Sequence, residues 1–380
     1  MAAPRAKAAS GVPVSAIDVV LDCIIFDLQA SGGVSRYWTN LILGLAAHRA
    51  GHQLHLLINA EARTESALAV IELAAKSPRF TVYPYARRRL ERVRQPAIPA
   101  DLARRAVFHS SYYRTVRGMP NIVTIHDFTH EDLVGGWHAY AQHWQKSQAI
   151  GRSAAVVCVS ESTRRDFTRR FPRHDGSPVE VIHHGIEARF SPGDDRTHHA
   201  RRDFVLFVGR RDPYKNFWSV AEALKRRRDL SLVVVGPPLS MRERGRLDAA
   251  IPGRYAECRQ VDDAGLVDLY RGAFALVYPS QYEGFGFPAL EAMACGCPVI
   301  ALNASSIPEV VGDGGILLNE ATPESIAGAL DRIRDQSLRA ALIARGMARA
   351  GRFSWADVAA RYSALYASLL HPGAATAAAM

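Results

Sequence analysis

The chain has 380 residues, of which 48% are hydrophobic, and a formal net charge of +10. This length suits two domains of ordinary size better than one. No apolar run approaches the roughly 20 residues of a membrane-spanning helix, which excludes an integral membrane protein. Residues 1–16 lack the apolar core of a signal peptide, and we expect them to form a flexible lead-in.

Five cysteines are scattered along the chain, and only Cys295 and Cys297 lie close together. A C-x-C spacing alone is a poor metal signature. Buried cysteine commonly behaves as a small apolar residue, so we expect reduced, inert thiols and a cytoplasmic protein.

The positive charge is concentrated in arginine-rich stretches at residues 86–95 and 162–173. Such stretches attract an anionic membrane surface, a nucleic acid or a phosphorylated acceptor. No nucleic-acid motif or interleaved aromatic residue accompanies them, so we expect no nucleic-acid partner. Two interpretations remain open here, namely peripheral contact with the inner face of a membrane and a solvated helix face.

Short apolar runs alternate with helix-length segments, which is typical of parallel β/α units. The first half predicts strands at residues 19–28, 54–59, 106–110, 121–126 and 154–160. The second half predicts strands at 204–209, 231–236, 275–280, 298–302 and 315–319. A polar, turn-rich linker at 183–203 separates the halves, and 354–370 predicts a final amphipathic helix. We therefore predict an α/β fold with a first domain at 17–190, a second domain at 191–352, a last helix at 353–371 and a flexible tail at 372–380.

Polar residues and glycines follow the predicted strands, where ligands bind in doubly wound folds. In the first half, Gly32 and Gly33 form either a tight turn or a close approach to a ligand. His126 ends another strand, and either contacts a ligand or is satisfied in the core. In the second half, Arg210, Arg211 and Lys215 follow a strand, where cations either neutralise a leaving diphosphate or are surface charges.

The stretch YEGFGFPALEA, from Tyr282 to Ala292, carries the most information. Its glycines allow close approach of the backbone to a ligand, and Pro288 suits the first turn of a helix. The helix start at 287–290 is therefore a candidate phosphate site. We expect Glu291 in the first helical turn, near that anion, where a carboxylate needs another task, such as accepting hydrogen bonds from ribose hydroxyls. Glu283 would then reach the sugar beyond the phosphates. The alternative is that Glu291 only complements the helix dipole and that Glu283 is a solvated loop residue.

Together these stretches resemble the family 4 retaining glycosyltransferases of the GT-B fold, in which two Rossmann-like, doubly wound domains face each other across a cleft. The resemblance covers nearly the whole chain, and its most specific parts are the E-x7-E motif, GRRDPYKN and the TIHD strand end. It implies that Glu291 binds the ribose, that Arg210 and Lys215 bind the diphosphate, and that His126 lies beside the reacting sugar. Glu283 and the backbone of Gly284, Phe285, Gly286 and Phe287 would hold the donor sugar, the helix start Pro288, Ala289 and Leu290 would hold phosphate, and Gly32 or Gly33 would approach it from the first domain. Whether Arg210 or Arg211 is the phosphate ligand stays open.

This resemblance implies transfer of a hexose from a nucleoside diphosphate sugar, with retained anomeric configuration, to a glycan or lipid-linked acceptor. No D-x-D triplet occurs in the chain, so we expect no metal cofactor and assign its task to the cations. The stretches GRRDPYKN and FHSSYYR favour a bacterial surface-polysaccharide or lipopolysaccharide enzyme that uses GDP-mannose or a related GDP-hexose. The alternatives are a nucleotide-sugar 2-epimerase of the same fold and a non-catalytic carbohydrate-binding protein. A dinucleotide oxidoreductase would need the G-x-G-x-x-G fingerprint, which DLQASGGVSRY lacks.

Overall fold

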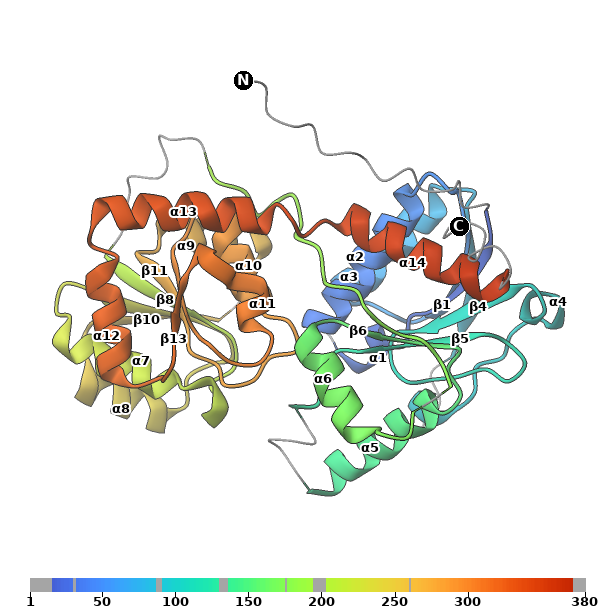
Figure 1. Cartoon of the computed structure of the whole chain (residues 1–380), viewed down its shortest axis with the longest axis horizontal. Coiled ribbons are helices and arrows are strands. Elements are labelled where there is room, and N and C mark those ends of the chain that lie inside the picture. The colour runs from blue at the N-terminus through green and yellow to red at the C-terminus, as the bar shows by residue number, and fades with distance from the viewer. Residues whose placement is uncertain are drawn as a thin grey trace.

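The computed structural model describes residues 16–29, 32–86, 91–129, 136–174, 176–193, 203–259 and 261–371. Most of the expected lead-in, the middle of the linker, Arg87 to Arg89 and the tail from 372 lie outside the described residues. Within the described part, the chain forms two α/β bodies that lie side by side (Figure 1).

The first domain contains a seven-stranded sheet whose described strand pairs are all parallel. In spatial order the strands are β3 (Phe80–Tyr85), β2 (Gln53–Asn59), β1 (Asp18–Asp22), β4 (Ala106–Ser110), β5 (Asn121–Ile125), β6 (Ala155–Cys158) and β7 (Val179–Val181). The helices are α1 (Ile25–Leu28), α2 (Gly33–Ala47), α3 (Glu65–Ala75), α4 (Ala100–Ala103), α5 (Gly136–Ile150) and α6 (Glu161–Arg170). The strand order reverses between β1 and β4, which makes their carboxyl ends a switch point where ligands bind.

The second domain repeats this design with a six-stranded parallel sheet. Its spatial order is β10 (Tyr255–Cys258), β9 (Ser231–Val235), β8 (Phe204–Val208), β11 (Ala275–Tyr278), β12 (Val299–Leu302) and β13 (Ile316–Leu318). The helices are α7 (Phe217–Ala223), α8 (Met241–Ala250), α9 (Asp263–Gly272), α10 (Phe287–Ala294), α11 (Ile307–Val311), α12 (Pro323–Arg332) and α13 (Gln336–Ala350). The switch point of this sheet lies between β8 and β11. The prediction of two doubly wound parallel-sheet domains is confirmed.

The last helix, α14 (Trp355–Leu370), leaves the second domain and packs on α2 of the first (Figure 1). Its buried face joins the core of the first domain, because the Tyr362 hydroxyl lies 2.5 Å from that of Tyr37 and the Tyr366 hydroxyl lies 2.7 Å from Nδ1 of His109. The chain thus crosses between the domains twice. The two crossings touch where Ile186 donates its backbone N–H to the carbonyl of Phe353 (2.9 Å).

Gly185 is required at this contact between the crossings. A Cβ atom at that position would lie 2.3 Å from the backbone nitrogen of Trp355, so any other residue would push the two segments apart. Residues 182–186 and 353–355 therefore form a compact, double-stranded junction between the domains.

Three strands of the structure were not predicted from the sequence, and one predicted strand is longer than the observed one. The missed strands β3, β7 and β10 lie at sheet edges and are only partly buried, so they lack the continuous apolar runs of central strands. The apolar run at 19–28 was predicted to be one strand. It is a strand only as far as Asp22, and from Ile25 it forms the short helix α1. The chain turns there because Ser111 accepts a hydrogen bond from the Ile25 N–H (3.0 Å).

Candidate active site

The predicted donor loops of the second domain meet at its switch point. The stretch from Gly209 to Lys215 follows β8, and the E-x7-E stretch follows β11. The backbone N–H of Gln281 donates to the carbonyl of Tyr214 (2.8 Å), which ties the two loops together.

Glu283 and Lys215 form an ion pair between these loops. Lys215 Nζ lies 2.6 Å from Glu283 Oε1, and the two side chains are only 11% and 15% exposed. The backbone of Glu283 is also fixed, because its carbonyl accepts hydrogen bonds from the hydroxyls of Ser305 (2.7 Å) and Ser306 (2.9 Å). A carboxylate and an ammonium therefore stand together at the position where ligands bind in this fold.

Helix α10 begins as the sequence predicts, at Phe287. Its N-cap is Gly286, whose φ of 110° lies in the left-handed region that favours glycine, and Pro288 lies in its first turn. The N–H groups of Ala289 and Leu290 already bond to the carbonyl of Gly286. Among these first residues, the Phe287 N–H is therefore the backbone donor best placed for a phosphate, since proline has none.

Glu291 lies deeper than the sequence suggests. It is the fifth residue of α10, in the second turn rather than the first, and is 1% exposed. Its carboxylate accepts hydrogen bonds from the hydroxyl of Tyr270 (2.8 Å) and from Nη1 of Arg36 (2.7 Å). Burial raises its pKa, and the charge of Arg36 opposes that rise.

Arg36 is a site residue that the sequence analysis missed. It belongs to α2 in the first domain, and besides Glu291 it pairs with Glu187 of the linker (2.5 Å). Its guanidinium also lies over the rings of Phe190 (5.3 Å) and Phe287 (5.6 Å). Arg36 therefore contacts both domains and the linker. An arginine within a helix belongs to no sequence motif from which these contacts could be predicted.

The two arginines after β8 have different environments. The side chain of Arg211 is 6% exposed and binds Glu243 (2.8 Å) and the carbonyls of Pro237 and Pro238. The pKa of Glu243 falls to about 2 through its hydrogen bond from Arg211. Arg210, in contrast, is 75% exposed and bonds to Asp212 at 3.1 Å. Arg211 thus fixes the loop after β9, whereas Arg210 is accessible to a ligand.

The first domain presents His126 and Gly33 to these loops, whereas the space beside Gly32 is filled by the side chain of Gln29. A Cβ atom on Gly284 would lie 2.0 Å from the carbonyl oxygen of His126, so only glycine allows this contact between the domains. Burial lowers the pKa of His126 to about 3, helped by the charge of Lys146, and the ring is neutral at pH 7. Gly33 lies against Phe287, with ring carbons 3.8 and 3.9 Å from where its Cβ would be. The starts of α2 and α10 therefore adjoin.

A separate pocket of about 560 Å³ opens at the carboxyl ends of β2 and β3. Tyr83, Tyr85, Glu91 and Arg94 are among its lining residues. Arg114 also lines it and is fixed by buried Asp22 and by Glu91 (2.9 Å). Aromatic faces beside polar groups are a surface suited to sugars.

Among the described residues, no group of three or more His, Cys, Asp and Glu side chains could hold a metal ion. In the same part of the chain, every helix is too short or too polar to cross a membrane.

Two protein-family models match the chain. The one described as Glycosyltransferase Family 4 matches residues 31–190, and the one described as Glycosyl transferases group 1 matches residues 194–349. Together they span most of both domains.

Curated proteins with similar sequences bear related names. An O-antigen chain mannosyltransferase B of Escherichia coli is 37% identical over 169 residues, which are 41% of this chain and 43% of that protein. A D-inositol 3-phosphate glycosyltransferase of Acidothermus cellulolyticus is 35% identical over 201 residues, 47% of this chain and 45% of that protein. The chain spans about half the length of these curated relatives.

Solved structures match over both domains. A sucrose-phosphate synthase from Thermosynechococcus elongatus has a TM-score of 0.72 at 21% identity, covering 94% of this chain and 100% of that one. HepE of Anabaena, in complex with UDP-glucose, has a TM-score of 0.68 at 14% identity, covering 93% and 100%. At these identities the likeness concerns the fold, and it confirms the predicted GT-B architecture.

Proposed function

Because the chain belongs to the family 4 glycosyltransferases, we propose that it is a retaining hexosyltransferase, which moves a hexose from a nucleoside diphosphate sugar to a glycan or lipid-linked acceptor. The observation that carries the proposal is the Glu283–Lys215 ion pair at the switch point of the second sheet, beside the contact of Gly284 with His126.

Each group of the proposed donor has a chemically suited partner in the second domain. The hexose hydroxyls bind Glu283, whose carboxylate is an acceptor only. Arg210, Lys215 and the start of α10 bind the diphosphate, because cations and a helix N-terminus both attract anions. Glu291 accepts hydrogen bonds from the ribose hydroxyls. Arg211 is not a phosphate ligand in this scheme, since its donors are already committed to Glu243 and two carbonyls.

We propose front-face attack for the chemical step. The acceptor oxygen bonds to the anomeric carbon on the face from which the phosphate oxygen departs, and the departing phosphate takes the acceptor proton. Negative charge grows on that phosphate, where Arg210 and Lys215 stabilise it. His126 is neutral, so it positions the sugar through hydrogen bonding instead of supplying a proton.

The acceptor occupies the first-domain side, and the pocket beside Tyr83 and Tyr85 holds a part of it that does not react. Neighbouring strands are about 4.8 Å apart, so β3 lies about 19 Å along the sheet from β5, which precedes His126. That distance suits an acceptor several sugars long. Tyr83→Ala is then expected to raise the acceptor KM and leave the donor KM unchanged.

We propose a GDP-hexose, GDP-mannose first, as the donor, and cell-surface polysaccharide or lipopolysaccharide synthesis as the role. The similarity to the O-antigen chain mannosyltransferase supports mannose as the sugar and polysaccharide synthesis as the role. Thermal-shift measurements with GDP-, UDP-, ADP- and dTDP-sugars test the donor, because a ligand at 100 times its Kd adds roughly 2.7 kcal/mol of stability. A UDP-sugar that stabilises best would overturn the choice of base.

We further place the enzyme in the cytoplasm, in peripheral contact with the inner face of the membrane. The supporting observation is the arginine-rich stretch at 86–95, of which Ala86, Glu91, Arg94 and Gln95 line the proposed acceptor pocket. A lipid-linked acceptor would present its sugars at that surface.

A further inference from the structure

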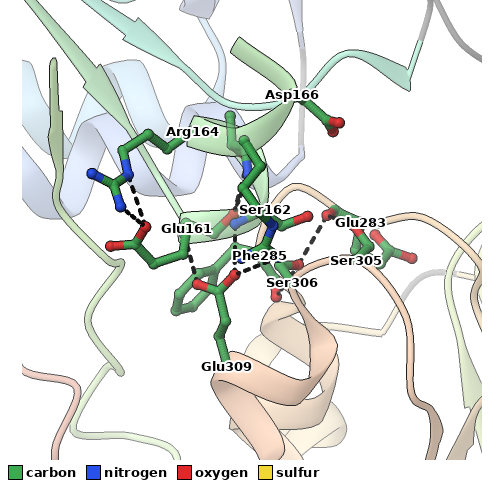
Figure 2. Close-up of polar contacts among 12 residues, drawn as sticks. Glu161, Ser162, Arg164, Asp166, Glu283, Phe285, Ser305, Ser306 and Glu309 are labelled. Carbon is green, nitrogen blue, oxygen red and sulfur yellow. Dashed lines mark hydrogen bonds and ion pairs between the residues drawn. The ribbon is translucent and has the colours of Figure 1, made fainter. Parts of the chain in front are cut away.

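Glu309 belongs to the second domain, yet it caps a helix of the first. Its two carboxylate oxygens accept hydrogen bonds from the backbone N–H groups of Glu161 (2.7 Å) and Ser162 (2.6 Å), at the start of α6 (Figure 2). The first N–H groups of a helix have no partner within it. The next of these, that of Thr163, bonds to the hydroxyl of Ser160 within the first domain. The two domains therefore complete this helix start together.

The capping carboxylate is ionised. Burial alone would raise the pKa of Glu309, but hydrogen bonds from His183 and from the two N–H groups of α6 hold it below its ordinary value. A negative charge at a helix N-terminus also meets the positive end of the helix dipole. Arg165 adds a weaker contact at 3.7 Å. The contact is thus charge-assisted, and such hydrogen bonds are about twice as strong as neutral ones.

The segment that carries Glu309 also holds the E-x7-E loop. Ser305 and Ser306, just before α11, bond through their hydroxyls to the carbonyl of Glu283, and Ser306 also bonds to that of Phe285 (2.9 Å). Figure 2 shows these contacts and the Glu309 cap on one short stretch of chain. A contact that holds Glu309 in place therefore also holds Ser305 and Ser306, which bond to the backbone of Glu283.

Helix α6 contacts the same loop on both sides of Glu283. The hydroxyl of Tyr282 donates to Asp166 (2.9 Å), and the hydroxyl of Thr163 donates to the carbonyl of Gly284 (3.3 Å). The α11 segment, the E-x7-E loop and α6 thus form a closed ring of contacts across the domain boundary.

We propose that Glu309 is a positioning residue, which docks α6 of the first domain onto the E-x7-E loop and thereby holds Glu283 toward the donor sugar. The inference rests on the proposed function, because it assigns Glu283 to the sugar. Glu309 itself touches neither sugar nor phosphate in this scheme. Its loss should therefore affect the hexose and spare the nucleoside diphosphate.

The test uses the full chain with Glu309→Gln, which keeps the side-chain size and removes the charge. Tyr282→Phe removes the hydrogen bond to Asp166, and with it the one that this hydroxyl accepts from the Phe128 N–H (3.1 Å). It leaves the Thr163 contact and the cap intact. Glu324→Gln is the control, because Glu324 is a 60% exposed carboxylate in the first turn of α12. For each protein we would measure kcat and donor KM, and by calorimetry the Kd of GDP and of GDP-mannose.

We expect Glu309→Gln and Tyr282→Phe to lower kcat at least tenfold and to remove the difference in Kd between GDP-mannose and GDP. The Kd of GDP should stay within twofold of the parent value, and Glu324→Gln should match the parent throughout. Unchanged kcat in a Glu309→Gln protein that only melts earlier would overturn the proposal and leave a purely structural cap.

Amide hydrogen exchange separates this proposal from the proposed function, because it requires no turnover. In Glu309→Gln we expect faster exchange at residues 161–163 and also at 282–286. Faster exchange confined to 161–163 would overturn the positioning role. If the parent chain transfers no sugar, the proposed function is contradicted. The exchange result would still decide whether the Glu309 cap at 161–163 holds the loop at 282–286.

Discussion

Arg36 of α2 and Glu291 of α10 form an ion pair across the domain boundary, with Nη1 2.7 Å from Oε1. The pair gives Glu291 a second task besides the proposed ribose contact, because a buried carboxylate without a partner would be costly. In the proposed donor complex, ribose hydroxyls would join the hydrogen bonds that Arg36 and Tyr270 already make to this carboxylate. Donor binding and domain contact are thus expected to depend on one side chain.

Glu291→Gln should weaken recognition of the ribose while preserving the packing around residue 291. Hydrogen bonds to a charged group contribute about 1.5 to 3 kcal/mol, which corresponds to about a 10- to 150-fold change in affinity. The measurement is the Kd of GDP and of 2′-deoxy-GDP by calorimetry. The parent should prefer GDP, and the variant should lose that preference. An equal preference for GDP in both proteins would show that Glu291 serves only its bonds with Arg36 and Tyr270.

Arg210→Ala and Lys215→Ala should lower kcat more than they raise the donor KM. The reason is that charge on the leaving diphosphate grows in the transition state, and loss of one such stabilising donor costs about 100- to 1,000-fold in other enzymes. Steady-state kinetics of the transfer reaction measure both constants. A change in KM alone would contradict the electrostatic role.

Arg211→Ala serves as the matched comparison at the neighbouring position. Because Arg211 fixes Glu243 and the loop at 237–238, its loss should lower the melting temperature. We expect kcat to stay closer to the parent value than in Arg210→Ala. The reverse order would make Arg211 the phosphate ligand.

The sequence predicted the two-domain fold and the loops of the site because both leave strong local signals. Continuous apolar runs identify central strands, and the glycines and Pro288 mark the start of α10. Arg36 and Glu309 left no such signal. Each lies within an ordinary helix, and its task arises only when the other domain is placed beside it. The depth of Glu291 was missed for a similar reason, since its burial depends on Tyr270 and Arg36 as well as on α10.

The environment of His184 predicts a loss of stability in acid. Its ring is 4% exposed, neither ring nitrogen has a hydrogen-bond partner, and it packs on Phe285, Phe287 and Tyr37. Burial holds its pKa well below 6.5, with a smaller contribution from the neighbouring histidines. The unfolded chain therefore binds a proton below pH 6.5 that the folded chain does not. Stability should fall by about 1.4 kcal/mol per pH unit in that range from this residue alone.

Urea unfolding of the parent and of His184→Asn at pH 7.5 and pH 5 measures this contribution. The substitution removes the titrating group, so the variant should lose less stability between the two pH values than the parent does. Identical losses in both proteins would show that His184 is protonated equally in the folded and unfolded chain.

Membrane contact can be tested through the arginines of the basic stretch at residues 86–95. Replacing Arg87, Arg88, Arg89 and Arg92 with serine should weaken binding to anionic vesicles, because each basic side chain near such a surface contributes about 1 kcal/mol. Arg94 is kept because it lines the proposed acceptor pocket. The donor KM should not change.

The control replaces as many exposed arginines in the second domain, namely Arg228, Arg242, Arg345 and Arg352. If the two sets of replacements weaken vesicle binding equally, binding depends on the net charge of the protein and not on the stretch at 86–95. A parent protein that does not bind vesicles would make the basic stretch a solvated face.

The central claim is that this chain transfers a hexose with retention of configuration, and NMR of the reaction tests it most directly. The parent protein is incubated with GDP-mannose and a mannose-terminated oligosaccharide, and the new anomeric proton and its carbon coupling are recorded as the product forms. The account predicts an α-linked product from the α-linked donor, and much slower formation in Lys215→Ala. A β-linked product, or conversion of the nucleotide sugar without any transfer, would contradict it.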